Sequence, residues 1–448
     1  MILPNEFIRQ TRELMGEERF ARYLAAFDEE PPVSIRLNPR RVRSDSPAQQ
    51  LLTPNSSLFT PQVPWCPLGV YLDHRPNFTF DPLLHAGCYY VQEAASMFLH
   101  HVLSEKLKVK SEEFPSGVPS ADGMAAANSS LFTLHSSLKV LDLCAAPGGK
   151  STCALSALPA GTRLWANEPV RQRASVLSEN IQKWGYEGCV VTNAYPRDYV
   201  RSGLTFDIII CDVPCSGEGM FRKDPQTIGE WSPQQVEKCW RLQRDIVSDA
   251  WQCLKPGGLL IYSTCTFNTK ENEENVRWIL SEYDAEAVAV STQAEWGITG
   301  SLLPGFDAPV YRFIPGITRS EGLFVCVLRK GGVEGEMKGD GRSVTSLHPS
   351  PSTRHQSSLC ILFDSDAPRQ QAVATVDLSY ADAISYLRGE ALRLPADTPR
   401  GLIAVTFQDH PLGLVKNIGT RANNLYPKEW RIRSTHIPQE YEAILRHT

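Results

Sequence analysis

Short apolar runs alternate with helical stretches along the middle of the chain, and this alternation limits the fold more than any other feature of the sequence. The apolar runs have the length of strands, and the stretches between them have helical periodicity. Such alternation is typical of a parallel sheet covered by helices on both faces. We therefore predict an α/β fold whose ligands bind beyond the carboxyl ends of the strands. The predicted strands span residues 138–143, 162–168, 188–193, 206–212, 257–265 and 321–330.

The stretch between the runs 206–212 and 257–265 carries clear helix signals. Ser232 is a suitable cap and Pro233 suits the first turn. Apolar side chains recur with helical spacing from Val236 to Leu254. We expect Gly257 to end this helix.

The overall charge excludes a uniformly basic protein. The 448 residues give room for two or three domains, and the net charge is −5. Affinity for an anionic polymer must therefore come from local basic patches. The first residues lack the features of a signal peptide, and no apolar run approaches the roughly 18 residues of a membrane span. These features predict a cytoplasmic protein with no membrane partner.

Twelve cysteines are present, and their spacing fits neither a CxxC pair nor a zinc site. We therefore expect no disulfide framework and no metal. Most of these cysteines lie in periodic segments and are predicted to be small core side chains, among them Cys153, Cys189, Cys239 and Cys253. Cys144, Cys215 and Cys265 differ, because each lies at the end of a predicted strand.

The turn after the first predicted strand reads VLDLCAAPGGKST. Gly148 and Gly149 allow close approach of a ligand to the backbone, and a helix begins there. The turn matches neither GxGxxG nor a phosphate loop. Glu168 ends the second strand, where an acid can bind ribose hydroxyls. Together they indicate an adenosine-type ligand, with S-adenosylmethionine favoured over a dinucleotide; the alternative is an ordinary turn with an exposed glutamate.

Several longer motifs point to one family. CAAPGGKST, DVPCSGEGMFRKDP and YSTCTFNTKENEENV together resemble the RNA cytosine-C5 methyltransferases of the NOL1/NOP2/sun family. DVPCSGEGMFRKDP with AGCYYVQEAASM and KNIGTRANNLYPKEWRIRST resembles its bacterial 16S ribosomal RNA branch. The resemblance runs along nearly the whole chain. It implies a Rossmann-like class I methyltransferase sheet, an N-terminal α+β domain and a small β-rich, PUA-like RNA-binding domain at the C-terminus. It also implies a monomer that uses S-adenosylmethionine and acts on 16S rRNA or the small ribosomal subunit.

The resemblance also assigns roles to residues. It implies that Cys265 attacks the base, that Cys215 assists release, and that Asp212 and Lys150 complete the catalytic set. It implies cofactor contacts at Cys144, Ala145, Ala146, Pro147, Gly148, Gly149, Lys150, Glu168, Arg173, Asn193 and Asp212. Two positions depart from the family pattern: Asn193 stands near the end of the third strand where many relatives have Asp, and Gly316 stands where many have His.

The chemistry explains why two thiols are useful. C5 of cytosine is a poor nucleophile, so a thiolate must first add to C6 and turn the ring into an enamine. From the residues alone, either Cys215 or Cys265 could attack, and only the resemblance favours Cys265. Asp212 is the candidate for hydrogen bonding to N3, and Lys150 could lower a thiol pKa or contact the nucleotide. The alternatives are a transfer RNA methyltransferase and a non-catalytic RNA-binding or ribosome assembly protein.

Composition predicts the domain limits. We expect an N-terminal RNA-binding region at 1–80, the methyltransferase domain at 81–330 with a polar insertion at about 107–137, a linker at 331–358 and a C-terminal RNA-binding domain at 359–448. Two basic segments are candidates for RNA contact. The first contains Arg36, Arg40, Arg41 and Arg43, with a solvated edge as the alternative. The second, at 411–433, has net charge +4 and contains Tyr426 and Trp430, which either stack on RNA or belong to a core.

Overall fold

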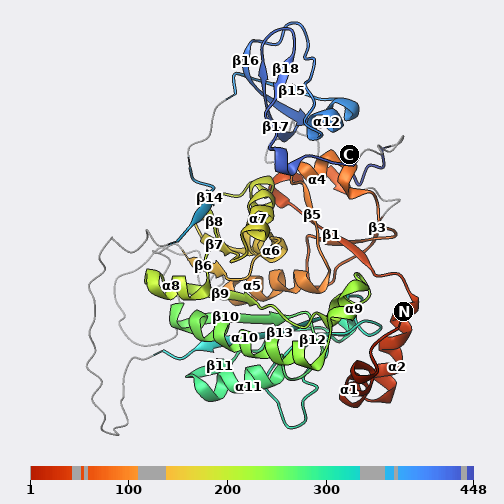
Figure 1. Ribbon diagram of the computed structural model, residues 1–448, viewed down its shortest axis with the longest axis vertical. Coiled ribbons are helices and arrows are strands. Elements are labelled where there is room, and N and C mark those ends of the chain that lie inside the picture. Colours follow the sequence, from red (N-terminus) through yellow and green to blue (C-terminus); the bar gives the residue numbers. More distant parts are fainter. Residues whose placement is uncertain are drawn as a thin grey trace, which may run out of the picture.

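A sheet of nine strands forms the centre of the protein (Figure 1). The computed structural model describes residues 2–42, 52–54, 59–108, 138–332, 359–367, 372–434 and 441–447. The strand order is β11-β13-β10-β9-β6-β7-β8-β14, and β12 pairs with β13. The strands are β6 Lys139–Asp142, β7 Arg163–Asn167, β8 Cys189–Thr192, β9 Phe206–Asp212, β10 Leu254–Thr264, β11 Ala285–Ala287, β12 Tyr311–Phe313, β13 Leu323–Lys330 and β14 Ile361–Asp364.

The five central strands are parallel, which confirms the predicted α/β sheet. The chain runs outward from β6 through β7 to β8, and then returns to place β9 on the other side of β6. The order therefore reverses between β6 and β9, and the loops that follow these two strands flank the switch point. β13 and the edge strand β14 run antiparallel to their neighbours β10 and β8.

Helices cover both faces of this sheet. Val140 and Ile208 point into a core shared with α5, α6 and α7, whereas Leu141 and Ile209 point into a core shared with α8, α10 and α11. Alternate residues of one strand thus serve opposite faces, which explains why the strands read as continuous apolar runs. The helices are α5 Phe98–Lys108, α6 Gly149–Ala157, α7 Arg171–Trp184, α8 Pro196–Ser202, α9 Gln226–Glu230, α10 Pro233–Cys253 and α11 Glu273–Glu282.

Helix α10 begins as predicted and ends earlier than predicted. The Ser232 side chain accepts a hydrogen bond from the backbone N–H of Gln235. The helix stops at Cys253, and Leu254 is already extended, so the expected stop at Gly257 was wrong. Pro256 explains the early end, because a proline disfavours helical backbone at the residue before it. The four cysteines predicted to be core side chains are all buried.

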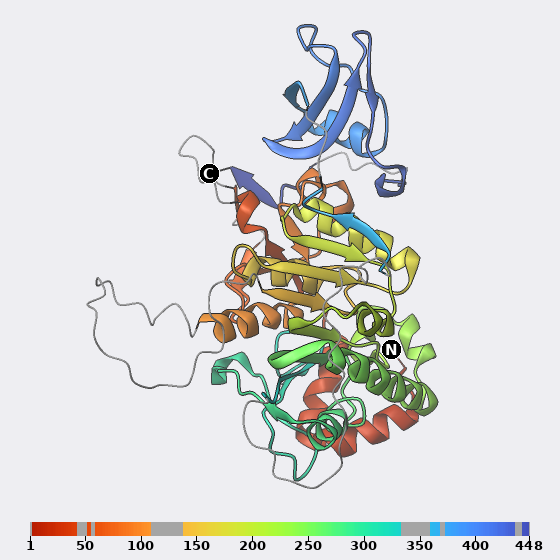
Figure 2. The same cartoon turned by 90° about the vertical axis from the view of Figure 1, so that its left-hand side faces the viewer.

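Two smaller four-stranded sheets accompany the central sheet, and the one in the C-terminal part lies at one end of the molecule (Figure 2). The N-terminal part holds the helices α1 Asn5–Met15, α2 Glu17–Ala25, α3 Pro39–Val42 and α4 Pro82–His85, and a sheet of β3 Phe59–Gln62, β4 Gly69–Leu72, β1 Val33–Leu37 and β5 Tyr89–Val91. The C-terminal part holds α12 Tyr380–Leu387 and a sheet of β15 Ala374–Asp377, β16 Gly401–Phe407, β17 His410–Asn417 and β18 Ala422–Asn424.

The N-terminal and C-terminal parts share one hydrophobic core. Ile35 and Leu72 of the first sheet belong to the same buried cluster as Ile384 and Val405 of the last. A third, two-stranded sheet joins β19 Leu445–His447 to β2 Leu52–Pro54. The two ends of the chain are therefore packed against each other.

One short segment beyond the predicted linker lies in the central sheet. Residues 361–364, which composition assigned to the C-terminal domain, pair with β8 in the central sheet. Most of the polar insertion, residues 109–137, and most of the linker, residues 333–358, lie outside the described residues. Within the described ranges, no helix combines the length and apolarity that a membrane crossing requires.

Two residues considered for RNA contact lie in the interior instead. Arg36 is fully buried, with its guanidinium 4.4 Å from the ring centre of Trp184, so the basic segment on β1 is neither a solvated edge nor an RNA surface at this residue. Arg40 is exposed, and Arg43 lies outside the described residues. Tyr426 is 3% exposed and packs against Tyr386, so base stacking by Tyr426 was wrong.

Candidate active site

Backbone and side-chain contacts fix the path of the loop after β6. Gly148 has a φ of +116°, and a Cβ at this position would lie 3.2 Å from the Leu177 side chain. The Asn167 side chain donates to the carbonyl of Leu143 at 3.0 Å, and the Asn167 carbonyl accepts from the Ala145 N–H at 2.8 Å. Residues 144–149, all predicted cofactor contacts, thus pass over the ends of β6 and β7 and lead into the first turn of α6.

Asp142 is a residue of this loop region that sequence reasoning missed, because it reads as part of a buried strand. It is fully buried at the end of β6, and Ser151 donates to its Oδ2 at 2.6 Å. Its Oδ1 has no hydrogen-bond partner within the described structure. Burial raises the pKa of Asp142 to about 7, more than the Ser151 hydrogen bond lowers it. An unpaired buried carboxylate oxygen beside the glycine turn suits a ligand with a hydrogen-bond donor.

Glu168 lies immediately after β7 and is 1% exposed, so the alternative of an exposed glutamate was wrong. Its Oε1 accepts from the Val170 N–H at 2.9 Å. Its Oε2 lies 3.4 Å from Arg173, which also donates to the Ala146 carbonyl at 3.1 Å. Arg173 therefore links Glu168 to the glycine turn.

Asn193 shapes the backbone beside Glu168. Its side-chain amide donates to the carbonyls of Glu168 and Pro169 at 2.7 and 2.9 Å. Since both amide hydrogens are used in this way, only the side-chain oxygen is left for an adenine ring. Tyr195, two residues later, is 68% exposed.

The thiols of Cys215 and Cys265 meet at the switch-point edge of the sheet. They follow the neighbouring parallel strands β9 and β10, in which Asp212 is paired with Ser263. Their sulfur atoms are 3.3 Å apart. The pKa of Cys215 is raised well above that of a free thiol, first by the hydrogen bond with the Cys265 sulfur and then by burial. Burial also raises the pKa of Cys144, which leaves that thiol protonated.

Lys150 and Asp212 form an ion pair next to these thiols, with Nζ and Oδ2 2.8 Å apart. Ser263 donates to the other oxygen of Asp212 at 2.7 Å. Burial alone would lower the pKa of Lys150, but the Asp212 carboxylate outweighs burial and the Cys265 sulfur adds to its effect, so the pKa is raised. Lys150 is therefore a firmly held cation. The structure brings all four predicted catalytic residues to one edge of the sheet.

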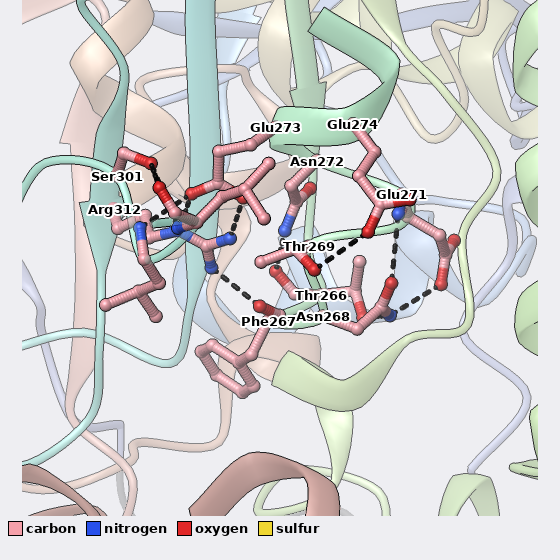
Figure 3. A network of polar contacts seen from close by, with 12 residues as sticks. Thr266, Phe267, Asn268, Thr269, Glu271, Asn272, Glu273, Glu274, Ser301 and Arg312 are labelled. Atoms are coloured by element: carbon pink, nitrogen blue, oxygen red, sulfur yellow. Dashed lines mark hydrogen bonds and ion pairs between the residues drawn. The ribbon is translucent and has the colours of Figure 1, made fainter. Parts of the chain in front are cut away.

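The segment that follows Cys265 carries a network of polar side chains that sequence reasoning missed (Figure 3). Glu271 is fully buried and burial raises its pKa to about 7, although Ser216 and Asn268 donate to it. Glu273 and Arg312, also fully buried, form a two-pronged ion pair, and Arg312 donates to the Phe267 carbonyl at 2.7 Å. The run NTKENEENV has the composition of a solvated polar segment, so the sequence does not predict that Glu271 and Glu273 are buried.

The N-terminal helices support the loop that carries Cys265. The ring of Tyr23 on α2 lies 5.3 Å from that of Phe267, and Phe7 on α1 packs against Trp231 at 5.4 Å. Gly316 packs against α2, because a Cβ there would lie 2.2 Å from the Arg22 carbonyl oxygen. At this position, where the resemblance led us to expect histidine, α2 leaves no room for a side chain.

Comparison with protein families gives three consecutive matches. Residues 130–329 match the family of 16S rRNA methyltransferase RsmB/F. Residues 3–94 match the N-terminal domain of 16S rRNA methyltransferase RsmF, and residues 373–432 match the methyltransferase RsmF PUA domain. The resemblance predicted from the motifs and the predicted PUA-like C-terminal domain are both confirmed by these matches.

Individual relatives are similar along the whole chain. The proteins named ribosomal RNA small subunit methyltransferase F from Cronobacter sakazakii and from Salmonella heidelberg are each 28% identical, over 95% of this chain and 96% of theirs. Two solved structures from Pyrococcus horikoshii share the fold over 73% of this chain. A methyltransferase homolog protein has a TM-score of 0.52 at 22% identity over 100% of that chain, and NSun6 with SFG has 0.54 at 20% identity over 98% of that chain.

Proposed function

The chain belongs to the 16S rRNA methyltransferase RsmB/F family, and from this membership we propose that it transfers a methyl group from S-adenosylmethionine to C5 of a cytosine in 16S rRNA. The observation that carries the cytosine-C5 part of the proposal is the pair of thiols 3.3 Å apart at the switch-point edge of the sheet. Ring nitrogens and hydroxyl oxygens can take a methyl group on a lone pair, whereas C5 of a pyrimidine such as cytosine needs a nucleophile added at C6.

The residues around the glycine turn fit S-adenosylmethionine. Glu168 stands where a carboxylate can accept hydrogen bonds from both ribose hydroxyls, and the unpaired Oδ1 of Asp142 can accept one from the amino acid part. The backbone of residues 144–149 and the first turn of α6 would hold the rest, with Asn193 beside the adenine. When bound, S-adenosylmethionine supplies an electrophilic methyl group on a sulfonium centre. Arg173 contacts Glu168 and the Ala146 carbonyl, so it borders the same proposed cofactor site.

We assign the attack to Cys265, as the resemblance implies. Its sulfur is one of the groups that raise the pKa of Lys150, so this cation lies close enough to interact with it. The pKa of Cys215 is raised by the Cys265 sulfur, by burial and by Glu271, which favours a protonated thiol there. The Cys265 thiolate adds to C6, forming the S–C6 bond and moving electron density to C5.

The release step breaks the S–C6 bond again. Once C5 carries the methyl group, a base removes the C5 proton, the C5–C6 double bond re-forms and the S–C6 bond breaks. Cys215, whose sulfur touches that of Cys265, is placed to assist this departure. Asp212, fixed by Lys150 and Ser263, is the candidate for a hydrogen bond to the ring edge.

The test compares two single substitutions. Cys265→Ala should abolish methylation while S-adenosylmethionine still binds. Cys215→Ala should methylate and then stall, leaving protein covalently bound to RNA. Denaturing gels with labelled RNA should show a persistent adduct for Cys215→Ala and none for Cys265→Ala or the double variant. An adduct trapped by Cys265→Ala instead would assign the attack to Cys215, and unchanged methylation in both variants would refute the thiol mechanism.

The substrate is tested separately. We propose a cytoplasmic monomer that contacts RNA through exposed basic residues of its PUA domain, including Lys416 and Arg421. Bisulfite sequencing of ribosomal and transfer RNA from a deletion strain should show one cytosine of 16S rRNA that loses its methyl group. Loss at a transfer RNA position alone would replace the rRNA assignment.

A further inference from the structure

Two buried carboxylates join the loops that carry the thiols. The first thiol loop comprises residues 213–219 after β9, and the second thiol loop comprises residues 265–272 after β10. Glu218 of the first loop accepts the backbone N–H groups of Phe267 and Asn268 in the second, at 2.7 and 3.0 Å. Glu271 of the second loop accepts the N–H of Ser216 in the first, at 3.0 Å. Each loop thus binds the backbone of the other within two or three residues of its cysteine.

Two further side chains connect the two thiol loops. The Asn268 amide donates to Glu218 Oε1 at 3.0 Å and to Glu271 Oε1 at 2.9 Å, so it bridges the two carboxylates (Figure 3 shows its contact with Glu271). Gln243 on α10 donates to Glu271 Oε2 at 2.7 Å and to the Pro214 carbonyl at 2.9 Å. The two loops are therefore anchored to a long helix as well as to each other.

Burying these two carboxylates is an energetically unfavourable way to hold two loops together. Glu218 is 3% exposed and Glu271 is fully buried. In the part of the chain that the structure describes, each recorded hydrogen bond to either group comes from a neutral N–H donor. Burying a carboxylate without a cation costs free energy that hydrogen bonds only partly offset. A neutral side chain would hold the loops at lower cost, so stability alone does not account for the two acids.

The position of the backbone beside the two cysteines gives a better explanation for the two acids. Each of the two carboxyl groups accepts hydrogen bonds from several N–H groups at once, at 2.7–3.0 Å. The backbone beside both cysteines is thereby fixed in a region without helix or strand. Displacement of a reacting group by about 1 Å can lower a rate about a hundredfold.

We propose that Glu218 and Glu271 are positioning residues that hold the Cys215 and Cys265 sulfur atoms at contact distance for addition to, and release from, the cytosine ring. The proposal deepens the function proposed above and rests on it for the reaction itself. The sulfur-to-sulfur geometry, however, can be measured without RNA.

The effective concentration of the two thiols measures this geometry directly. In a glutathione redox buffer, two thiols and one oxidised glutathione give one protein disulfide and two reduced glutathione molecules. The equilibrium constant is read from peptide maps of Cys215 and Cys265. Glu218→Gln and Glu271→Gln keep the side-chain shape but set an NH2 group against an N–H donor. Both should lower the effective concentration at least tenfold, and kcat at least tenfold, with the dissociation constant of S-adenosylmethionine within twofold of wild type.

Glu274→Gln is the matched control. Glu274 lies on the same segment and accepts from Thr269, but its recorded contact does not reach the first thiol loop. It should match the wild type in both measurements. Asn268→Ala provides a milder second variant if either glutamine variant fails to fold, and it should lower both quantities at least threefold.

The outcomes separate the two proposals. An unchanged thiol equilibrium in all three loop variants would overturn the positioning role, and so would a tenfold looser thiol pair with unchanged kcat. A wild-type protein that fails to methylate cytosine, while the variants still loosen the thiol pair, would overturn the proposed function and leave the thiol geometry standing.

Discussion

The buried ion pair between Arg312 and Glu273 should be the costliest single contact to break beneath the thiol loops. Arg312 is 1% exposed and Glu273 is fully buried, and two nitrogens of the guanidinium face the two carboxylate oxygens. Removing one member leaves the other charged and unpaired in the interior, which costs about 3–5 kcal/mol. We expect a loss of this size for Glu273→Leu and for Arg312→Met separately.

The double substitution should cost much less than the sum of the two. With both charges gone, the remaining penalties are the Phe267 carbonyl, which accepted from Arg312, and the Leu302 N–H, which donated to Glu273 at 3.0 Å. Each unpaired backbone group costs about 1–3 kcal/mol. The double variant should therefore lose roughly 2–6 kcal/mol rather than 6–10, a coupling of about 4 kcal/mol when corresponding ends of the two ranges are compared.

Hydrogen exchange is the suitable assay, because the chain has several parts and one global unfolding energy would be ill defined. Exchange of peptides covering residues 266–280 reports the local opening free energy, and peptides from β16 serve as an internal reference. If the two single losses simply add in the double variant, the ion pair contributes nothing as a pair and the reasoning fails. The same variants should lower kcat, because Phe267 lies two residues after Cys265.

Three other predictions concern ligands and the insertion. Glu168→Ala should weaken S-adenosylmethionine binding by roughly 1–3 kcal/mol in calorimetry, because ribose hydrogen bonds to a charged group are lost; unchanged affinity would remove Glu168 from the site. Lys416→Ala with Arg421→Ala, both exposed in the PUA domain, should make the slope of log affinity against log salt shallower by roughly 1.5, and an equal slope would show that this face does not meet phosphates. Replacing residues 109–137 with a short Gly-Ser linker should keep turnover within a few-fold, since a polar loop adds little closure cost; complete loss in a folded protein would make the segment part of the working site.

The sequence alone predicts the parts of this protein that depend on local pattern. The strands of the central sheet follow from continuous apolar runs, and the start of α10 follows from Ser232 and Pro233, because periodicity and capping act within a few residues. The three cysteines singled out at strand ends are only partly buried, unlike the predicted core cysteines. The early end of α10 could also have been predicted from Pro256.

Contacts between distant segments could not be predicted in this way. Arg36 is buried because Thr152, more than a hundred positions later, supplies both a hydroxyl and a carbonyl to its guanidinium. Glu271 looks like a surface residue until the first thiol loop, some fifty positions earlier, brings it an N–H donor. Tyr426 looks like a stacking platform until α12 covers it. In each case the residue is buried by a partner that lies far away in the sequence, beyond the few residues on which local patterns depend.

The core shared by the two ends of the chain has a consequence for how the protein is made. Ile35 and Leu72 belong to the same buried cluster as Ile444 and Leu445. A ribosome adding roughly 5–20 residues per second needs about 20–70 s to travel from the N-terminal sheet to Ile444 and Leu445. During that time the apolar face of the N-terminal sheet is not covered by these side chains. Chaperone binding to this face during translation should therefore raise the yield of folded protein.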